Sequence, residues 1–394
     1  AKMGHQGTIY EALHVPGGVL VYGIPEFRLP KEIVQAEVNY VTSLGVRLEL
    51  DSVVGKLVTI DELLNNGYQA VFLGTGAGLP MFLNIPGENL NGVYSANEFL
   101  TRVNLMKAYQ FPAYNTPVKV GKRVAVIGGG NVAMDSARCA LRLGAEEVYV
   151  VYRRSEVEMP ARREEVENAK EEGIQFKLLT VPKRFLGNDQ NWVVGMECYE
   201  MELGEPDASG RRRPIPVKGS EFNMDVDNVI IAIGQGVDKA MLPKELDYAD
   251  WGTLSVDSVS LQTNIEGVFA GGDVVAGPAD VIGAIAAGKE AAISIDRYLT
   301  GVDLKEGRPT PIKRVKEVSK EGVEAKARAA MPVLDLKKRE AFAEVELGFD
   351  EKAAIEEAKR CLNCSVCSEC LECVKVCEPG AINQEMEEEY KEIE

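Results

Sequence analysis

The sequence is poor in histidine: His5 and His14 are its two histidines in 394 residues, and neither lies in a motif typical of acid–base catalysis. No apolar run is long enough to cross a bilayer, so no membrane span is predicted. An excess of basic residues is also missing, because the formal net charge is −17, and this disfavours non-specific nucleic-acid binding. Since no secretion signal is recognisable, we expect a cytoplasmic protein.

Cysteine is scarce except near the C-terminus. Cys139 and Cys198 stand alone and are predicted to be buried thiols that pack like small apolar side chains. Six more fall within seventeen residues: Cys361, Cys364, Cys367, Cys370, Cys373 and Cys377. The last four have the spacing C-x-x-C-x-x-C-x-x-x-C and precede Pro379, as in bacterial ferredoxin sites for a [4Fe–4S] cluster, which transfers single electrons.

Two other uses of these cysteines compete with the cluster. A disulfide framework suits small secreted proteins, and this chain is neither small nor predicted to be secreted. Structural zinc usually needs two C-x-x-C pairs separated by a longer loop, whereas here the pairs are fused end to end. The spacing therefore favours iron–sulfur, and it leaves Cys361 and Cys364 either for a second cluster completed by other ligands or as competitors for the first.

The clearest fold signal is a strand–helix–strand unit. A short apolar strand is predicted over 124–127, a helix from the glycine-rich segment 128–133 to about Leu143, and another strand over 147–152. This order with a right-handed crossover is a Rossmann unit. Gly128 and Gly130 allow the backbone to turn tightly and approach a pyrophosphate at the helix N-terminus.

The end of the second strand indicates which dinucleotide binds. NAD-binding folds often carry an acidic residue there for the ribose 2′-hydroxyl, but this chain has Arg153 and Arg154, with Arg162 and Arg163 shortly after. Guanidinium groups suit a 2′-phosphate, so NADPH is favoured over NADH. A further basic run, 211–213, is predicted to be an exposed turn without a binding role.

Other segments are typical of a flavin site. Glu11 ends a predicted strand over 8–10 and suits an adenosine ribose, and Gly17 and Gly18 allow close approach of backbone to a ring or phosphate. Asp273 follows a strand over 268–270 and suits a ribityl hydroxyl. A helix over 281–299 would direct its N-terminus, near Ile282, at the flavin pyrimidine oxygens. Residues 1–5 are predicted to end a helix.

Five segments together resemble one family, the FAD-dependent pyridine nucleotide oxidoreductases of the glutamate synthase small-subunit type. Within it, the chain most resembles the flavin subunit of NADH-dependent ferredoxin:NADP oxidoreductases, which perform electron bifurcation. The resemblance covers about residues 1–300, and its motifs are specific. The segments are EALHVPGGVLVYGIPEFRLP (11–30), GENLNGVYSANEFLTRVNLM (87–106), VAVIGGGNVAMD (124–135), VYRRSEVEMPAR (151–162) and VFAGGDVVAGPADVIGAIAAGKEAA (268–292).

The resemblance implies FAD, NADPH and an α/β fold with two Rossmann-like three-layer nucleotide-binding domains. It implies FAD contacts at Glu11, Gly17, Gly18, Leu20, Arg28, Val54, Thr75, Gly76, Gly272, Asp273 and Ile282. It implies NADPH contacts at Gly128, Gly130, Asn131, Val132, Arg153, Arg154, Ile233 and Gly234. The expected division is an FAD domain over 1–115 and 241–300, an inserted NADPH domain over 116–240, a linker over 301–350 and a ferredoxin-like iron–sulfur segment over 351–394.

Two departures from the family pattern qualify this assignment. Members begin with a strand and a G-x-G-x-x-G loop for the FAD pyrophosphate, and this sequence contains neither, so we expect the FAD domain to need a strand that is not in it. Relatives of the glutamate synthase type also carry their cysteines at the N-terminus, whereas these are C-terminal. Cluster geometry and the electron path therefore do not transfer from the family.

The expected function is hydride transfer between NADPH and FAD, followed by single-electron transfer to [4Fe–4S] clusters. The expected partners are other electron-transfer subunits of a hetero-oligomeric complex, and ferredoxin or another one-electron acceptor, in an electron-bifurcating assembly. One alternative is the electron-input small subunit of a glutamate synthase. Another is a non-catalytic relay or structural subunit with a degenerate flavin site. No catalytic side chain is predicted, because the flavin itself exchanges the hydride.

Overall fold

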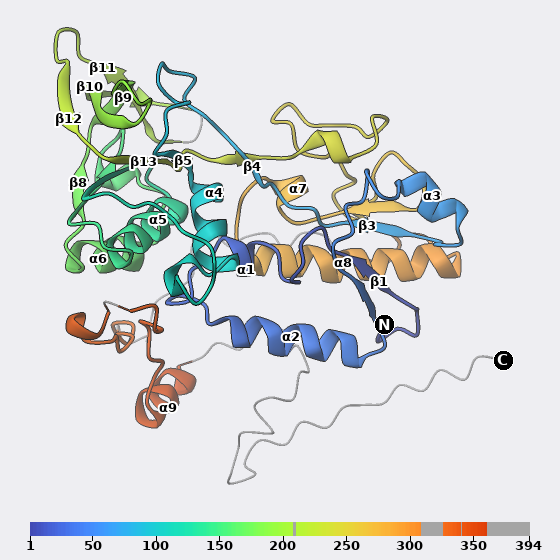
Figure 1. Cartoon of the computed structure of the whole chain (residues 1–394). Helices are drawn as coiled ribbons and strands as arrows, with labels where there is room; N and C mark the ends of the chain where they lie inside the picture. The colour runs from blue at the N-terminus through green and yellow to red at the C-terminus, as the bar shows by residue number, and fades with distance from the viewer. Residues whose placement is uncertain (208–209, 309–325, 340, 361–394) are drawn as a thin grey trace. The chain divides into compact units, whose positions relative to one another are not determined.

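The computed structural model describes residues 1–207, 210–308, 326–339 and 341–360. The chain divides into two compact units, Ala1–Ser319 with Leu334–Glu346, and Lys320–Val333 with Leu347–Glu394. Figure 1 shows the described helices and strands, which together form an α/β fold, as predicted. The six clustered cysteines lie outside the described residues.

A five-stranded parallel sheet forms the centre of the predicted NADPH domain. Its central strands are buried, including all of β13 and four of the five residues of β6. Two flanking helices, α5 (Asn131–Arg142) and α6 (Arg163–Glu171), supply apolar and small side chains to the core. The strand order is β5 (Val93–Ser95), β13 (Asn228–Ile231), β6 (Arg123–Ile127), β7 (Glu147–Val151) and β8 (Gln175–Lys177).

Helix α5 begins and ends where the sequence predicts. Gly130 is its N-cap, and the alanines of its inner face have no exposed surface, so the helix approaches the sheet closely. It ends at Arg142, before Gly144, whose φ of 102° is accessible to glycine at little cost. The strand–helix–strand prediction for this unit is confirmed.

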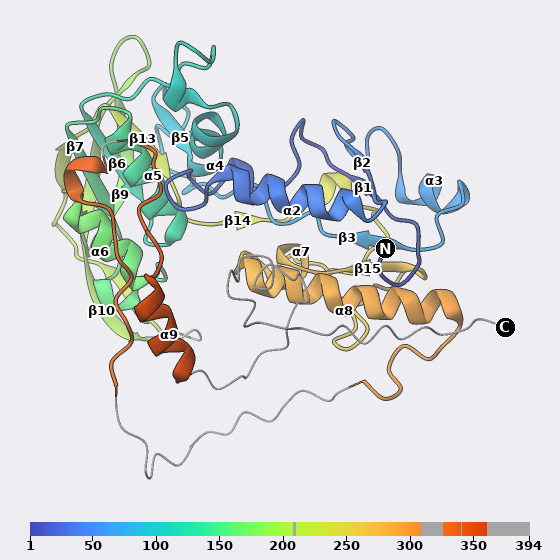
Figure 2. The ribbon, with the colours of Figure 1, turned by 90° about the horizontal axis from the view of Figure 1, so that it is seen from below.

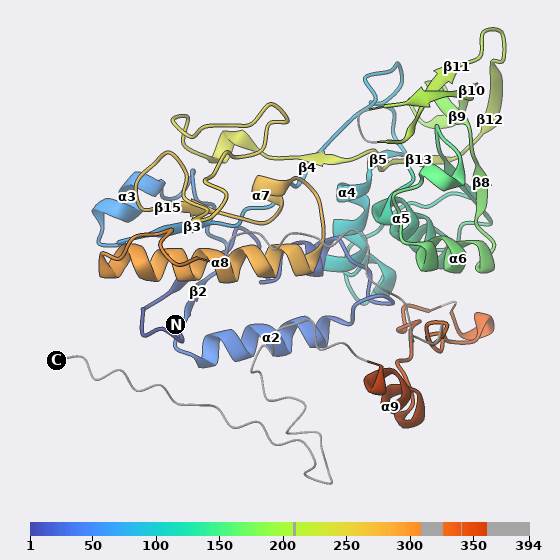
Figure 3. The same ribbon diagram turned by 180° about the vertical axis from the view of Figure 1, so that it is seen from behind.

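An antiparallel sheet follows in the chain, and the sequence interpretation did not include it. Its long strand β10 pairs with β9, β11 and β12 (Figure 3). Arg212 and Arg213 are exposed, as predicted, but they lie in β11, so the turn predicted over 211–213 is wrong for these two residues. The strands are β9 (Thr180–Gly187), β10 (Val193–Pro206), β11 (Arg212–Pro216) and β12 (Phe222–Asp225).

The predicted FAD domain contains two separate parallel strand pairs. β1 (Thr8–Tyr10) pairs with β2 (Arg47–Glu49), and β3 (Val71–Leu73) pairs with β15 (Val268–Ala270). Helix α8 runs along the second pair (Figure 2). The accompanying helices are α1 (Val19–Tyr22), α2 (Lys31–Ser43), α3 (Ile60–Asn65), α7 (Asp273–Ala276) and α8 (Val281–Thr300). Residues 1–5 form turns, so the helix predicted to end there is absent.

Short elements complete the first unit. The two-residue strands β4 (Leu79–Pro80) and β14 (Gln235–Gly236) pair antiparallel. Helix α4 (Ala96–Leu100) continues into η1 (Thr101–Leu105), a π-helical turn of a kind often found at functional sites. The remaining short helices of the first unit are η2 (Ala108–Gln110), η3 (Glu156–Glu158), η4 (Lys239–Met241) and η5 (Leu336–Lys338).

Two segments belong to different parts of the fold from those expected. Strand β5 falls in the range assigned to the first FAD segment, yet it pairs with β13 of the NADPH sheet. Part of the range assigned to the linker packs on the first unit, where Phe342 stacks on Tyr109 with ring centroids 4.3 Å apart. In the second unit, α9 (Glu351–Lys359) is capped by Asp350, which accepts a hydrogen bond from the Ala353 N–H at 2.7 Å.

Candidate functional site

The ends of the parallel strands carry the residues predicted to contact FAD. Glu11 follows β1 and accepts a hydrogen bond from the Leu13 N–H at 2.9 Å. Asp273 follows β15 in the first turn of α7 and accepts one from the Ala279 N–H at 3.2 Å. Because these strands are parallel within each pair, their carboxyl ends form the edge at which nucleotides bind in open α/β sheets.

Gly17 has a strict steric reason to be glycine. Its φ is 118°, and a Cβ there would lie 2.7 Å from a Val21 methyl and 2.9 Å from a Val34 methyl. Gly18 follows with a φ of 52° and is the N-cap of α1. The turn therefore keeps the chain close to α2, and nothing lies within 4 Å of the Cβ position on Gly18, which leaves space for a flat ring or phosphate.

The other predicted FAD residues differ in their surroundings. Ile282 is 75% exposed in the first turn of α8, whose N-cap Asp280 accepts a hydrogen bond from the Gly283 N–H at 2.7 Å. Thr75 is exposed directly after β3, beside Gly76 with a φ of 71°. Leu20 and Val54 pack against apolar clusters of the domain, and Gly272 caps α7.

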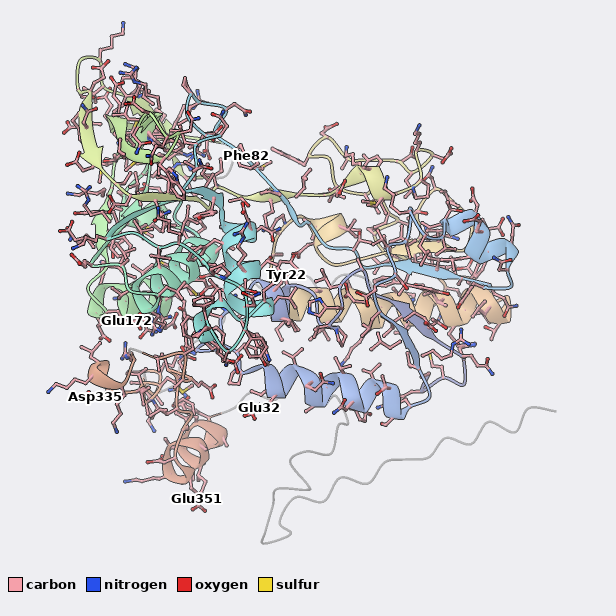
Figure 4. The ribbon with its side chains drawn as sticks, in the orientation of Figure 1. Tyr22, Glu32, Phe82, Glu172, Asp335 and Glu351 are labelled. Atoms are coloured by element: carbon pink, nitrogen blue, oxygen red, sulfur yellow. The ribbon has the colours of Figure 1, made fainter. Side chains whose placement is uncertain are left out.

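Tyr22 is a residue that the sequence interpretation missed. It is the last residue of α1 (Figure 4). Its hydroxyl lies 3.4 Å from where a Cβ on Gly78 would be. Burial, followed by the charges of Asp273 and Glu11, raises the pKa of Tyr22. The phenol is thus close to both predicted ribose-binding and ribityl-binding carboxylates and stays protonated near neutral pH. The only sequence signal was its place within the 11–30 motif.

A buried amide lies next to Tyr22. Asn104, in the π-helical turn η1, donates from Nδ2 to the Tyr22 carbonyl at 3.2 Å. Its Oδ1 is buried and has no hydrogen-bond partner in the part of the chain that the structure describes. A buried polar atom without a partner is uncommon, and bound groups or water usually satisfy such atoms. This amide is compatible with a ligand beside Tyr22.

Arg28, predicted to contact FAD, is paired with residues of the predicted NADPH domain. Its Nη1 donates to both carboxylate oxygens of Asp135 at 2.9 and 2.8 Å, and its Nε lies 3.2 Å from Glu165. The carboxylate of Glu165 also binds Arg138, at 2.6 Å. Burial raises the pKa of Asp135 to about 6, although Arg28 opposes this shift. Arg28 therefore joins the two predicted domains.

A second set of ion pairs continues this network on the NADPH side. Arg138 and Arg142 bind Glu172, at 2.9 and 2.7 Å respectively, just beyond α6 (Figure 4). Burial opposes ionisation of Glu172, but hydrogen bonds from Arg142 and Arg138 outweigh it and lower the pKa of Glu172. Arg339, from the packed part of the predicted linker, binds Asn168 at 3.2 Å. These fully paired charges fix α5 and α6 rather than leaving a cation for a ligand.

The predicted pyrophosphate loop has the close packing that its glycines require. A Cβ on Gly128, whose φ is 148°, would lie 2.2 Å from the Ala232 carbonyl oxygen. A Cβ on Gly129 would lie 2.7 Å from the Tyr152 ring. Asn131 accepts a hydrogen bond from the Arg162 N–H at 2.9 Å, which holds the next loop against the start of α5, where Val132 is exposed.

Arg153 and Arg154 are adjacent in sequence and differ in the structure. Arg154 is 4% exposed; its Nε donates to the Arg212 carbonyl at 2.8 Å and its Nη2 to Asp207 at 2.7 Å. Arg153 is exposed, and partial burial of its charge, then the neighbouring Arg154 and Arg211, lower its pKa. Of the two, Arg153 is the one available to an incoming anion.

Ile233 and Gly234 lie just past the end of β13, at the carboxyl edge of the sheet. Ile233 is partly exposed, and Gly234, with a φ of 133°, accepts a hydrogen bond from the Met81 N–H at 3.0 Å. The segment therefore has the placement expected of a residue pair beside a dinucleotide.

A family model described as "Pyridine nucleotide-disulphide oxidoreductase" matches residues 14–288. The chain belongs to the pyridine nucleotide-disulphide oxidoreductase family. This assignment explains why two glycine-rich strand–helix units occur in one chain. It confirms the resemblance noted for the sequence, and with it an oxidoreductase that uses a flavin and a pyridine nucleotide.

Curated relatives refine the family assignment. The chain is 43% identical to the NADP(+)-dependent formate dehydrogenase subunit beta of Moorella thermoacetica over 92% of its own length and 52% of the relative. It is 38% identical to the NADPH-Fe(3+) oxidoreductase subunit beta of Geobacter sulfurreducens, over 92% of its own length and 58% of the relative. The glutamate synthase [NADPH] small chain of Escherichia coli is 37% identical over 76% of the chain and 64% of that protein. The chain thus spans little more than half of the first two relatives.

Solved structures confirm the fold of this family member. Mycobacterium tuberculosis FprA in complex with NADPH aligns with a TM-score of 0.61 at 23% identity, over 75% of this chain and 78% of that one. Thioredoxin reductase of T. acidophilum aligns with a TM-score of 0.58 at 18% identity, over 77% and 93%. The predicted α/β architecture is therefore confirmed.

Cys139 and Cys198 are free and buried, as predicted. Burial raises the pKa of Cys198 to about 12 and raises that of Cys139 still further. Neither belongs to a group of metal-ligating side chains, since none occurs among the described residues. In the described part of this family member, no helix is both long and apolar enough to cross a membrane.

Proposed function

We propose that the chain is the flavin subunit of a cytoplasmic NADPH-dependent electron-transfer complex. It would exchange a hydride between NADPH and FAD and single electrons between FAD and a C-terminal [4Fe–4S] cluster. The observation that carries the proposal is the family match over 14–288 combined with the six-cysteine run that follows it in sequence. Two relatives whose names include NADPH or NADP(+) align over 92% of the chain, beyond the family match.

In this proposal the FAD-binding residues are Glu11, the glycine turn 17–18, Tyr22 and Asp273. The fit is supported by the open space beside Gly18, where nothing lies within 4 Å of a Cβ position, and by the Asn104 Oδ1, which has no hydrogen-bond partner among the described residues. When bound, FAD accepts two electrons together and releases them one at a time, which no side chain here can do. The chain's own residues would bind it, orient it and hold the Tyr22 hydroxyl protonated beside Asp273.

The NADPH-binding residues in this proposal are the loop 128–132, Arg153, Ile233 and Gly234. Loop and helix α5 would bind the pyrophosphate through backbone N–H groups, and Arg153 would bind the 2′-phosphate. The proposal keeps the expected division in which this domain is inserted into the FAD domain. It changes one detail, the role of Arg154. Because its guanidinium is hydrogen-bonded to Asp207 and to the Arg212 carbonyl, Arg154 would hold the surrounding residues in place and would not contact NADPH itself.

The electron acceptors beyond the cluster are proposed by class. Candidates are ferredoxin or another one-electron carrier, and companion subunits that bind the cysteine-bearing segment. Electron bifurcation is the finer form of the proposal, and it is supported by the sequence resemblance alone. Its test is whether NADPH oxidation by the complex purified with its companion subunits requires a low-potential and a high-potential acceptor together.

Spectroscopy of the purified, cofactor-loaded chain tests the core of the proposal. We expect flavin absorption that bleaches on addition of NADPH, together with an electron paramagnetic resonance signal from a reduced [4Fe–4S] cluster. In a Cys373→Ala variant the flavin should still bleach while the cluster signal is lost. A matched Cys198→Ala variant, which removes a buried thiol far in sequence from the run, should retain both signals. A colourless, zinc-containing preparation that does not react with NADPH would refute the proposal.

A further inference from the structure

The hairpin between β10 and β11 is fastened to the end of β7. Its closing pair is Pro206 opposite Arg212, and the Asp207 N–H donates to the Arg211 carbonyl at 2.8 Å. Arg154 lies just past β7 and donates two hydrogen bonds to the base of this hairpin. Its Nε donates to the Arg212 carbonyl and its Nη2 to the Asp207 carboxylate. The base of the hairpin is therefore held beside the strand end at which a dinucleotide ribose binds in Rossmann folds.

This fastening brings cations from two distant parts of the chain together. Arg153 and Arg154 come from the end of β7, and Arg211 comes from the hairpin. The charge of Arg211 is near enough to Arg153 to lower its pKa, in addition to the effects of partial burial and of Arg154. Asp207, which is bound to Arg154, acts in the opposite direction on the pKa of Arg153 and offsets part of this effect. A dianion placed at Arg153 would reduce this repulsion among like charges.

We propose that Arg211 binds the 2′-phosphate of NADPH together with Arg153 and so helps to select NADPH over NADH. The inference rests on the proposed function, because it takes the pyridine nucleotide to lie at the end of β7. A 2′-phosphate carries close to two negative charges at neutral pH, which suits two guanidinium groups. Arg154 is then a positioning residue, since its buried guanidinium holds the hairpin that carries Arg211.

Binding of nucleotide fragments tests this without turnover. The probes are 2′,5′-ADP, which carries the 2′-phosphate, and 5′-AMP, which lacks it, titrated calorimetrically into the FAD-loaded protein. Arg211→Ala should weaken 2′,5′-ADP by about 10- to 100-fold, the range for loss of a charge-assisted hydrogen bond, and leave 5′-AMP within about twofold. The ratio of kcat/KM for NADPH to that for NADH should fall by a similar factor.

Arg213→Ala is the matched control. Arg213 is exposed on β11, two residues along the same hairpin, so the variant removes the same charge from the same element. It should change 2′,5′-ADP binding by less than about threefold, an effect expected from the general field alone. An Arg211→Gln variant with an unchanged melting temperature guards against loss of the hairpin, and it should behave like Arg211→Ala.

The outcomes separate this inference from the proposed function. Wild-type protein that binds neither fragment contradicts both. Wild-type protein that prefers 2′,5′-ADP, with Arg211→Ala and Arg213→Ala alike, leaves NADPH binding in place and overturns the role of Arg211. Equal weakening of both fragments by Arg211→Ala also overturns it, because a 2′-phosphate ligand must discriminate between them.

Discussion

The two nucleotide-binding halves of this chain differ in how completely their strands are paired. In the NADPH half, defined by β5, β6, β7, β8 and β13 with their helices, five parallel strands form one sheet. In the flavin half, defined by β1, β2, β3 and β15 with α7 and α8, three-residue strands form two separate pairs. All of β13 is buried, whereas Phe72 in β3 is 38% exposed and Ile285 in α8 is 51% exposed.

The difference shows that the two halves need not be equally stable on their own. A five-stranded sheet buries its central strands and satisfies their backbone groups, while isolated strand pairs are marginal in water. We expect the NADPH half to hold its shape without ligand and the flavin half to depend more on what it binds. Arg28 couples the two, because its guanidinium from one half pairs with Asp135 and Glu165 of the other.

Loss of Arg28 should have the largest effect on stability. Arg28→Ala leaves the buried Asp135 without its cation, so we expect the free energy of unfolding to fall by about 3–5 kcal/mol, measured by chemical denaturation. Lys31→Ala, which removes a nearby cation bound to backbone carbonyls, is the comparison variant and should cost less. If Arg28 instead acts only as an FAD ligand, Arg28→Ala would weaken FAD binding and leave the stability of the apoprotein unchanged.

The buried Asp135, which pairs with Arg28, should make the free energy of unfolding depend on pH. Its pKa in the folded protein, about 6, is higher than its usual value of 3.8, so the folded state holds the proton more tightly than the unfolded state. The Asp135 contribution to stability should therefore decrease as pH rises from about 4 to 6 and level off above, by about 1.4 kcal/mol per unit of pKa shift. Asp135→Asn should remove that part of the pH profile; a profile unchanged by the substitution would exclude Asp135 as its source.

Alanine substitutions at two glycines test how rigid the NADPH half is. Gly128→Ala places a Cβ against the Ala232 carbonyl oxygen at a φ of 148°, so we expect a loss of about 2–4 kcal/mol in unfolding free energy. Gly144 is a matched position with a positive φ, 102°, but nothing within 4 Å of its Cβ position. Gly144→Ala should cost about 1 kcal/mol. Equal losses at the two positions would mean that the loop can move away from Ala232.

Hydrogen exchange with and without FAD tests the flavin half directly. At an FAD concentration 100 times the dissociation constant, binding stabilises the folded state by about 2.7 kcal/mol, equivalent to roughly 100-fold slower exchange where protection depends on it. We expect this slowing in β1, β3, β15 and the first turns of α8, and little change in β6 and β13. Uniform slowing of exchange over both halves would show that they unfold together, and it would contradict the expected difference in their stability.

The smallest expected effect is in thiol labelling, where we expect no reaction of the two buried cysteines in the folded protein. Cys198 has its pKa raised to about 12 by burial, and Cys139 is also buried, so almost no thiolate exists at pH 8. Iodoacetamide treatment of the folded protein should leave both unmodified by mass spectrometry, with or without FAD. Rapid modification of Cys139, which lies in α5, would mean that the NADPH half opens in the native protein as readily as the flavin half.

Local segments with strong patterns were predictable. The apolar run before Gly128, the alanine-rich helix after it and the strand before Arg153 form β6, α5 and β7 within a residue or two of expectation. The strands before Glu11 and Asp273 and helix α8 were found in the same way. Each combines a short apolar run with glycine or a cap, so its conformation depends mainly on neighbours in sequence.

Pairings between distant segments were not predictable. The β9–β12 sheet depends on hydrogen bonds between strands, and its register is set by partners up to tens of residues away. β5 belongs to the NADPH sheet through β13, 136 residues later at the first matched pair, Val93 with Val229, although its sequence position suggested the flavin half. The charged residues 334–346 resemble a linker, but Arg339 and Phe342 pack on the first unit.

The sequence by itself determined the family, the two glycine-rich nucleotide motifs and the cysteine spacing, because each depends on residue types at short fixed intervals. Only the tertiary structure separated Arg153 from Arg154, brought Arg211 to the same strand end and paired Arg28 with Asp135. Charge and burial at one position depend on side chains that folding brings from elsewhere in the chain. Two identical neighbours in sequence can therefore end with one guanidinium buried and bound and the other open to an anion.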